Sequence, residues 1–125
     1  MVHTAPYLGL SFLAVNHQRP ALQDMGVRQA LSMTIDRATI TDKVLGSGER
    51  PAWSLVPHGT AAYPEPAQAD WRDESLAESR ARARTLMEAA GFGPGRPLQL
   101  QLRYPQSENR YYHSNYCQFL QLARL

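Results

Sequence analysis

The sequence contains too little cysteine for a disulfide framework, and it has no long apolar run. Cys117 is the single cysteine among the 125 residues, so it has no internal partner and does not fix the redox compartment. No stretch reaches the roughly 18 apolar residues that a membrane-spanning helix requires. The amino terminus also lacks the basic and apolar segments of a secretory signal, so we expect no signal peptide in this chain.

The sequence also has no large excess of positive or negative charge. The 13 Lys and Arg residues are balanced by 11 Asp and Glu residues, which leaves a formal net charge of +2. Because acidic side chains lie between the arginines, the sequence predicts a solvated surface rather than a nucleic-acid or membrane interface. We therefore expect no nucleic-acid partner.

The residue patterns that mark a catalytic or metal centre are missing too. The four histidines have no i, i+4 pairing and no cysteine or acid at metal-ligand spacing, so no metal site is expected. Neither a nucleophile elbow nor a pair of carboxylates with a catalytic signature is present. We expect a protein without a cofactor and without enzymatic activity.

Apolar residues are plentiful enough for one core. They make up 43% of the chain, which predicts one domain at most. Residues 7–15 are almost continuously apolar, as in a strand that is covered on both faces. Residues 98–104 alternate apolar and polar side chains, which is the pattern of a half-buried strand. We expect both segments to belong to one sheet.

Helices are predicted between and after these two segments. Asp24 is placed to cap a first helix, and Asp36 is placed to cap a second, shorter helix that ends at Gly46. The prolines and glycines of residues 46–71 predict a long surface loop. A last helix is expected after Ser107.

The helix with the clearest signals covers residues 75–90. Ser75 and Glu78 have the spacing of a capping box. Gly91 suits a left-handed helix end, and Phe92 follows it as in a Schellman motif. The apolar stripe that we expect to be buried consists of Leu76, Ala83, Leu86, Met87 and Ala90. Strands and helices in this order predict an α/β fold, a mixed sheet with helices packed on it.

Three stretches resemble the signature of the family 5 solute-binding proteins of peptide ABC importers. Asn16 closes the first predicted strand and is followed by Arg19-Pro20-Ala21-Leu22, Asp24-Met25-Gly26-Val27-Arg28-Gln29-Ala30-Leu31 and Ile35-Asp36-Arg37. The loop Pro51-Ala52-Trp53-Ser54-Leu55-Val56-Pro57 and the helix end at residues 83–91 also resemble parts of the family pattern. We interpret the charged and polar members of the first motif as structural residues: Asn16, Asp24, Arg28, Asp36 and Arg37.

The resemblance implies that residues 1–125 are a single partial domain from the carboxy-terminal lobe of a bilobed protein with the type II periplasmic-binding-protein fold. It implies the substrate-binding component of an ABC importer, periplasmic or extracellular, that delivers a peptide or related small solute to permease subunits. A ligand-sensing module of a transcriptional regulator is the alternative. Because a truncated sheet leaves strand edges unpaired, we expect the isolated chain to be poorly stable or to self-associate.

The resemblance also implies where a ligand binds. In the family, the strand before the Asn supplies ligand contacts, which implies Phe12 and Ala14 here. Trp53 is a third candidate, because a Trp on a loop bracketed by prolines forms a rigid stacking wall. Each aromatic residue has a structural alternative, in which Phe12 packs in the core and Trp53 pins its own loop. Arg28 is interpreted as satisfying a backbone carbonyl or a carboxylate, and Asp36 as a helix cap.

Overall fold

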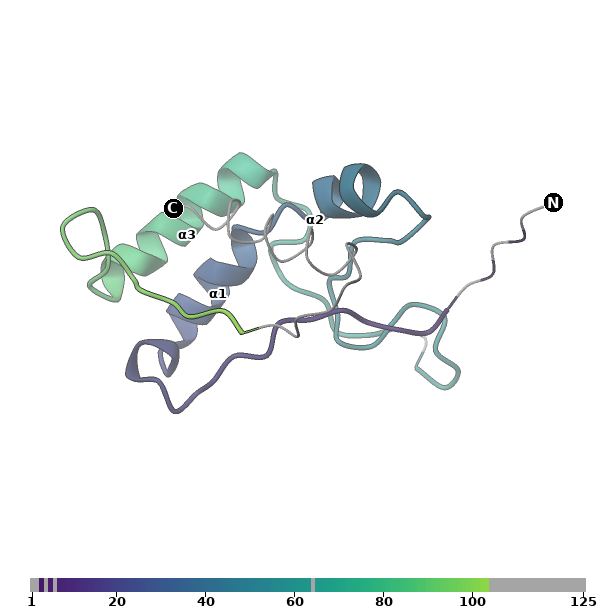
Figure 1. The fold of residues 1–125 in the computed structure, drawn as a ribbon, viewed down its shortest axis with the longest axis horizontal. Helices are drawn as coiled ribbons and strands as arrows, with labels where there is room; N and C mark the ends of the chain where they lie inside the picture. The colour runs from purple at the N-terminus through teal and green to yellow at the C-terminus, as the bar shows by residue number, and fades with distance from the viewer. Residues whose placement is uncertain (1–2, 4, 6, 64, 104–125) are drawn as a thin grey trace.

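Two helices that pack against each other organise the structure, a computed structural model that describes residues 3, 5, 7–63 and 65–103 (Figure 1). α1 spans Met25–Met33 and α3 spans Leu76–Ala89. Between them lies α2, Arg37–Thr39, which continues into the π-helix η2, Ile40–Leu45. A short 3-10 turn, η1, covers Pro20–Leu22 and precedes α1.

The start of α1 is fixed by two side chains. The Asp24 carboxylate accepts a hydrogen bond from the Val27 amide at 3.2 Å, so Asp24 caps the helix as predicted. The Arg28 guanidinium reaches back and donates to the carbonyls of Leu22 and Gln23 at 3.0 and 2.6 Å. These bonds tie η1 to α1 and agree with the interpretation of Arg28 as a partner for backbone carbonyls.

The second predicted helix is present, but its backbone widens along its length. The Asp36 carboxylate accepts from the Thr39 amide at 2.9 Å and from the Thr39 hydroxyl at 2.7 Å, and it thereby caps α2. The hydrogen bonds then change to the π pattern of η2, which the sequence did not predict. Gly46 ends η2 with a φ of +62°, a left-handed conformation that glycine adopts without strain.

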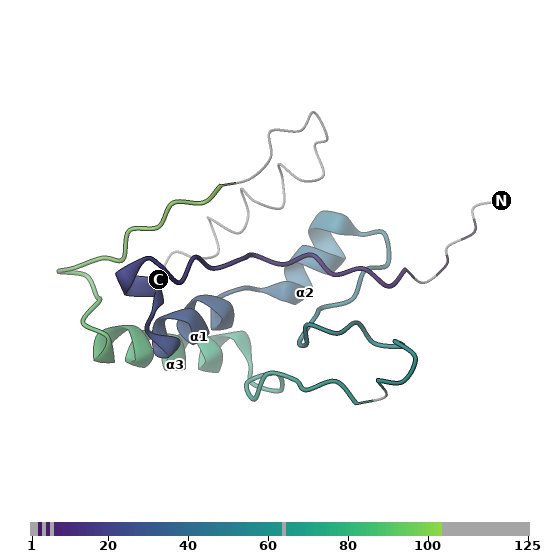
Figure 2. The ribbon, with the colours of Figure 1, turned by 90° about the horizontal axis from the view of Figure 1, so that it is seen from below.

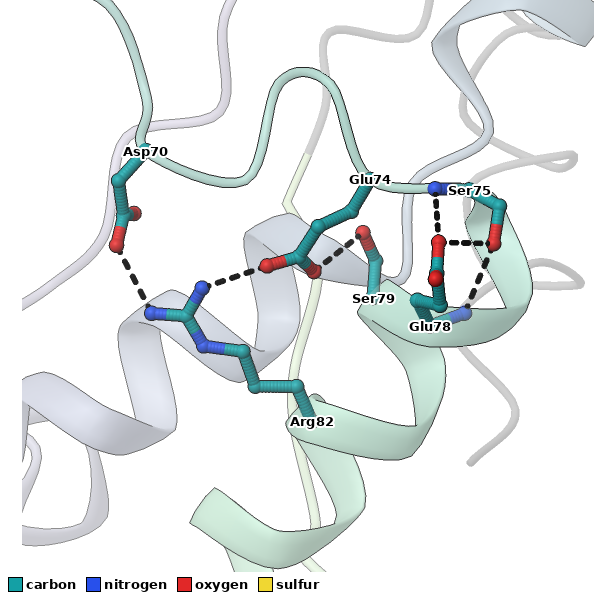
Figure 3. Close-up of polar contacts among 6 residues, drawn as sticks. All are labelled: Asp70, Glu74, Ser75, Glu78, Ser79 and Arg82. Carbon is teal, nitrogen blue, oxygen red and sulfur yellow. Dashed lines mark hydrogen bonds and ion pairs between the residues drawn. The ribbon is translucent and has the colours of Figure 1, made fainter.

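Both ends of α3 are closed as predicted. The Ser75 hydroxyl accepts from the Glu78 amide at 3.3 Å, and the Glu78 carboxylate accepts from the Ser75 amide at 2.8 Å (Figure 3). At the other end, Gly91 has a φ of +81°, and the amides of Gly91 and Phe92 donate back to carbonyls of the last turn. This pair of bonds forms a Schellman motif, which satisfies carbonyls that a helix end leaves without partners.

The core lies where α1 meets α3. Its buried apolar residues are Val27, Ala30, Met33, Ala83 and Met87. The predicted stripe of α3 is confirmed at Ala83 and Met87, whereas Leu76 and Leu86 are half-buried and the polar Ser79 is buried. Half-buried side chains pack around this core: Leu22, Leu31, Trp71, Leu86, Ala90, Phe92 and Leu98.

The two predicted strands, and with them the mixed sheet, are not found in the described residues. Residues 7–15 and 98–103 carry no strand pairing, and residue 104 lies outside the described part. Figure 2 shows the two segments following different courses, so neither pairs with the other. An extended segment becomes a strand only when a neighbouring backbone pairs with it, and an apolar pattern does not supply that neighbour. The helix expected after Ser107, together with Cys117, also lies outside the described residues.

Acidification is expected to weaken the start of α3 through Glu78. Hydrogen bonds from the Ser75 hydroxyl and amide lower the pKa of Glu78 below its ordinary value. The stabilisation by Glu78 is therefore fully present above about pH 5 and is lost as the pH falls through the lowered pKa. We expect Glu78→Ala to reduce the melting temperature by a few degrees at neutral pH, and this difference to vanish in acid.

The matched control for this pH dependence is Glu88→Ala, which removes an exposed carboxylate near the other end of the same helix. A negative charge there opposes the helix dipole, so its removal should leave the melting temperature unchanged or slightly raised at neutral pH. Thermal melts followed by circular dichroism over a range of pH make the comparison. Equal losses in the two variants, or a Glu78→Ala effect that persists in acid, would contradict the prediction.

Candidate functional site

Arg37 and Trp53 form a stacked pair that joins α2 to the loop after η2. The guanidinium carbon of Arg37 lies 4.6 Å from the centre of the Trp53 ring, a cation–π arrangement. The same guanidinium donates to the Ala52 carbonyl at 3.0 Å, and to the carbonyl and hydroxyl of Ser32 at 3.0 and 2.8 Å. One side chain thus connects the carboxyl end of α1 with a loop residue 15 positions after Arg37.

Carbonyl oxygens and a ring face surround the Arg37 charge. Burial lowers the pKa of Arg37, but a guanidinium stays protonated at physiological pH. The Ser32 carbonyl lies in the last turn of α1, where the helix dipole favours a cation, and the Ile35 carbonyl lies just beyond that helix. The face of Trp53 adds a second region of negative potential. Dipoles and a π face therefore stabilise a fixed positive charge at this point.

Asp36 precedes Arg37 and directs its carboxylate toward the first turn of α2. Burial by itself raises the pKa of Asp36, but hydrogen bonds from the Thr39 amide and hydroxyl lower it, as do the charges of Arg80 and Lys43. The resulting pKa of Asp36 lies below its ordinary value. Asp36 therefore remains ionised near neutral pH and acts as the cap of α2.

The loop that carries Trp53 is held at its far end by the start of α3. The Ala69 amide donates to the Trp53 carbonyl at 3.0 Å. At the next residue, the Asp70 carboxylate accepts from Arg82 at 2.9 Å, and Arg82 also binds Glu74 at 2.8 Å (Figure 3). The hydrogen bond from Arg82 lowers the pKa of Asp70. Trp53 therefore sits on a segment that is braced from both sides.

Phe12 and Ala14 lie on a different part of the chain from Trp53. Both are exposed on the extended segment 7–15, and Phe12 keeps 67% of its surface accessible, so it is not part of the core. Asn16 ends this segment in a turn, in which its side-chain oxygen accepts from the Gln18 amide at 2.9 Å. Trp53 is half-buried, and the structure joins it to the motif residue Arg37.

The contact between Arg37 and Trp53 was not predicted from the sequence. The two residues belong to different motifs, and no helical or strand periodicity relates their positions. The only signal was the Trp itself, because a large aromatic residue between two prolines indicates an anchored loop. Its partner could be found only in three dimensions.

Metal and membrane features are absent from the described part of the chain. No group of at least 3 His, Cys, Asp or Glu side chains is arranged there to hold a metal ion. Among the helices of these residues, none combines the length and apolar character that crossing a membrane requires.

Comparison with known sequences identifies the class of protein. The chain belongs to the bacterial extracellular solute-binding proteins, family 5, and the model for the middle region of that family matches residues 1–123. This is a family of binding proteins and not of enzymes.

Curated relatives share much of the sequence. The periplasmic murein peptide-binding protein MppA of Escherichia coli strain K12 is 50% identical over 109 residues, which cover 86% of this chain and 20% of that protein. The periplasmic oligopeptide-binding protein OppA of the same strain is 34% identical over 109 residues, with 86% and 20% covered. The chain thus spans about a fifth of the length of these relatives.

Solved structures have the same fold over the matched region. The murein tripeptide binding protein MppA of Escherichia coli superposes with a TM-score of 0.78 at 42% identity, covering 86% of this chain and 20% of that chain. OppA of Burkholderia pseudomallei gives a TM-score of 0.73 at 33% identity, covering 82% and 20%. The described residues therefore reproduce part of the α/β fold of these solute-binding proteins, although they contain no strand.

Proposed function

We propose that the chain is part of the substrate-binding component of an ABC importer for peptides, which captures a peptide or related small solute and delivers it to permease subunits. The observation that carries this proposal is the 50% identity to the murein peptide-binding protein MppA across 86% of the chain. The TM-score of 0.78 with a murein tripeptide binding protein supports the same class of solute.

In this proposal, residues 1–125 form a single partial domain within the carboxy-terminal lobe of a bilobed type II periplasmic-binding-protein fold. The chain's share of about a fifth of the relatives' length supports a partial domain. The full-length protein, called the parent protein below, is proposed to act in the periplasm or outside the cell. MppA and OppA are both named as periplasmic proteins, which supports that location.

We propose that Phe12, Ala14 and Trp53 contact the solute. The exposed positions of Phe12 and Ala14 on an extended segment suit strand-like pairing with a peptide main chain. Trp53 is half-buried, so part of this residue stays accessible beside Arg37. In this scheme Asn16, Asp24, Arg28 and Asp36 shape the scaffold through the turn and cap bonds that they make.

The regulator alternative gains no support from these relatives, because MppA and OppA are named as periplasmic binding proteins and not as regulators. Self-association of the isolated chain remains a proposal. Exposed apolar side chains on the extended segment favour it, since Tyr7 is 90% exposed and Phe12 is 67% exposed.

Calorimetric titration of the parent protein with a murein tripeptide, and separately with trialanine, tests the proposed function. We expect saturable binding of at least one peptide with micromolar or tighter affinity, and Phe12→Ala should weaken this binding about tenfold. Tyr63→Ala is the matched control, because Tyr63 is an exposed aromatic residue on the loop that we do not assign to the site. A parent protein that binds neither peptide would contradict the proposal.

A further inference from the structure

We infer that Arg37 is a positioning residue that sets the orientation of the Trp53 ring for contact with the solute. This inference rests on the proposed function, because it assigns Trp53 to the solute-binding surface. The hydrogen bonds of Arg37 are directed into the scaffold, to Ser32 and Ala52 among others. Arg37 therefore acts on a solute through the ring that it holds.

The contacts of Arg37 restrict the plane of its guanidinium in several directions. Nη1 and Nη2 donate to the carbonyl and the hydroxyl of Ser32, which fixes the plane relative to α1. Nε donates to the Ala52 carbonyl, which fixes the backbone directly before Trp53. The carbon of this restrained guanidinium lies 4.6 Å from the centre of the Trp53 ring. Because these directions require a planar fork of donors, lysine at position 37 would not reproduce them.

The choice of a cation at this position favours a role beyond packing. Burial removes part of the hydration of the Arg37 charge and so lowers its pKa, a cost that the surrounding carbonyls and the Trp53 ring offset. An apolar side chain would cover the Trp53 ring without that cost, but it would not impose a direction on the ring. An aromatic side chain stacks well on a solute only when the orientation of its ring is fixed. Part of Trp53 stays accessible after stacking, since the residue is only half-buried.

Hydrogen bonds on both sides of Trp53 also restrain the loop backbone. The Ala52 carbonyl binds Arg37 on one side of the residue pair, and the Trp53 carbonyl binds the Ala69 amide on the other. The backbone at Trp53 is thus held from both directions, which leaves the side-chain torsions as the main freedom of the ring. The contact with Arg37 restricts that freedom.

The test is a double-variant comparison in the parent protein, with the murein tripeptide and trialanine as the titrated peptides. We expect Arg37→Met and Trp53→Ala each to weaken binding about tenfold. The double variant should be no weaker than Trp53→Ala alone, because Arg37 acts through the ring. Arg28→Met is the matched control: Arg28 also donates to two backbone carbonyls, whereas the cation on Trp53 is Arg37. It should lower the melting temperature and leave the affinity unchanged.

Losses that add in the double variant would overturn the inference, and so would full affinity in Arg37→Met. Ser32→Ala is a milder variant for the case that Arg37→Met does not fold, since it removes only the hydroxyl partner of Nη2. With fluorotryptophan incorporated, it should shift the fluorine resonance of residue 53 and leave that of Trp71 in place. An unchanged resonance at residue 53 would refute the restraint.

The outcomes also separate this inference from the proposed function on which it rests. A parent protein that binds peptide but is insensitive to Trp53→Ala refutes the role of Arg37 and leaves the proposed function intact. A parent protein that binds neither peptide refutes both.

Discussion

Met33→Ala is expected to lower the free energy of unfolding by about 2 to 5 kcal/mol. Met33 is 1% exposed and is one of the largest fully buried side chains, in the contact between α1 and α3. Truncation removes buried apolar surface and leaves a cavity, because the closely packed residues around Met33 relax only partly to fill the space. Urea denaturation of the parent protein measures the change.

Met25→Ala is the matched control for this substitution. It makes the same change in the same helix, but Met25 is 64% exposed. We expect its effect to stay within about 0.5 kcal/mol, since Met25 is exposed and the cap of α1 is formed by the Asp24 side chain, which this change leaves in place. Similar losses at the two methionines would show that the contact between α1 and α3 is not the core of this region.

The 125-residue chain on its own is expected to bind peptides at least about a hundredfold more weakly than the parent protein. A bilobed receptor gains affinity when its lobes close, because closure removes water from the peptide backbone and completes its strand-like pairing. One open surface with Phe12 and part of Trp53 recovers much less of that energy. Association meanwhile costs about 4 to 15 kcal/mol in translational and rotational freedom.

Parallel titrations of the chain and the parent protein with the murein tripeptide and trialanine check this difference. Analytical ultracentrifugation of the chain belongs beside them, because self-association through exposed residues such as Tyr7 would itself cover Phe12. Tight saturable binding by the monomeric chain would place the whole site within residues 1–125. That result would contradict a two-lobe mechanism.

Helix ends were predictable because their signals are local. Asp24 and Asp36 each bind an amide three residues further along, and Ser75 and Glu78 satisfy each other within one turn. The left-handed Gly91 is likewise specified by the residues beside it. Such interactions need no information about the rest of the fold, so residue types and spacing suffice to place them.

Features that depend on distant partners were not predictable in the same way. The apolar pattern of residues 7–15 predicted a strand that is not found, because pairing requires a neighbouring backbone that the described residues do not provide. The same limit applies to the candidate site. The sequence suggested that Trp53 either anchors its loop or contacts a ligand. Its contact with Arg37 could be identified only in the folded structure. Whether Phe12, Ala14 and Trp53 contact a solute stays a prediction.

The widened turn of η2 has a consequence for how this region tolerates insertions and deletions. In a π-helix each turn holds more residues than in an α-helix, and here the Gly46 amide reaches back to the Thr41 carbonyl at 2.9 Å. Removing one residue from Ile40–Leu45 would let the segment wind as an ordinary α-helix, in which fewer residues complete the same rotation. The following loop would then leave in nearly the same direction, and Trp53 would keep its approach to Arg37. We therefore expect this six-residue segment to tolerate the loss of one residue better than α1 or α3 would.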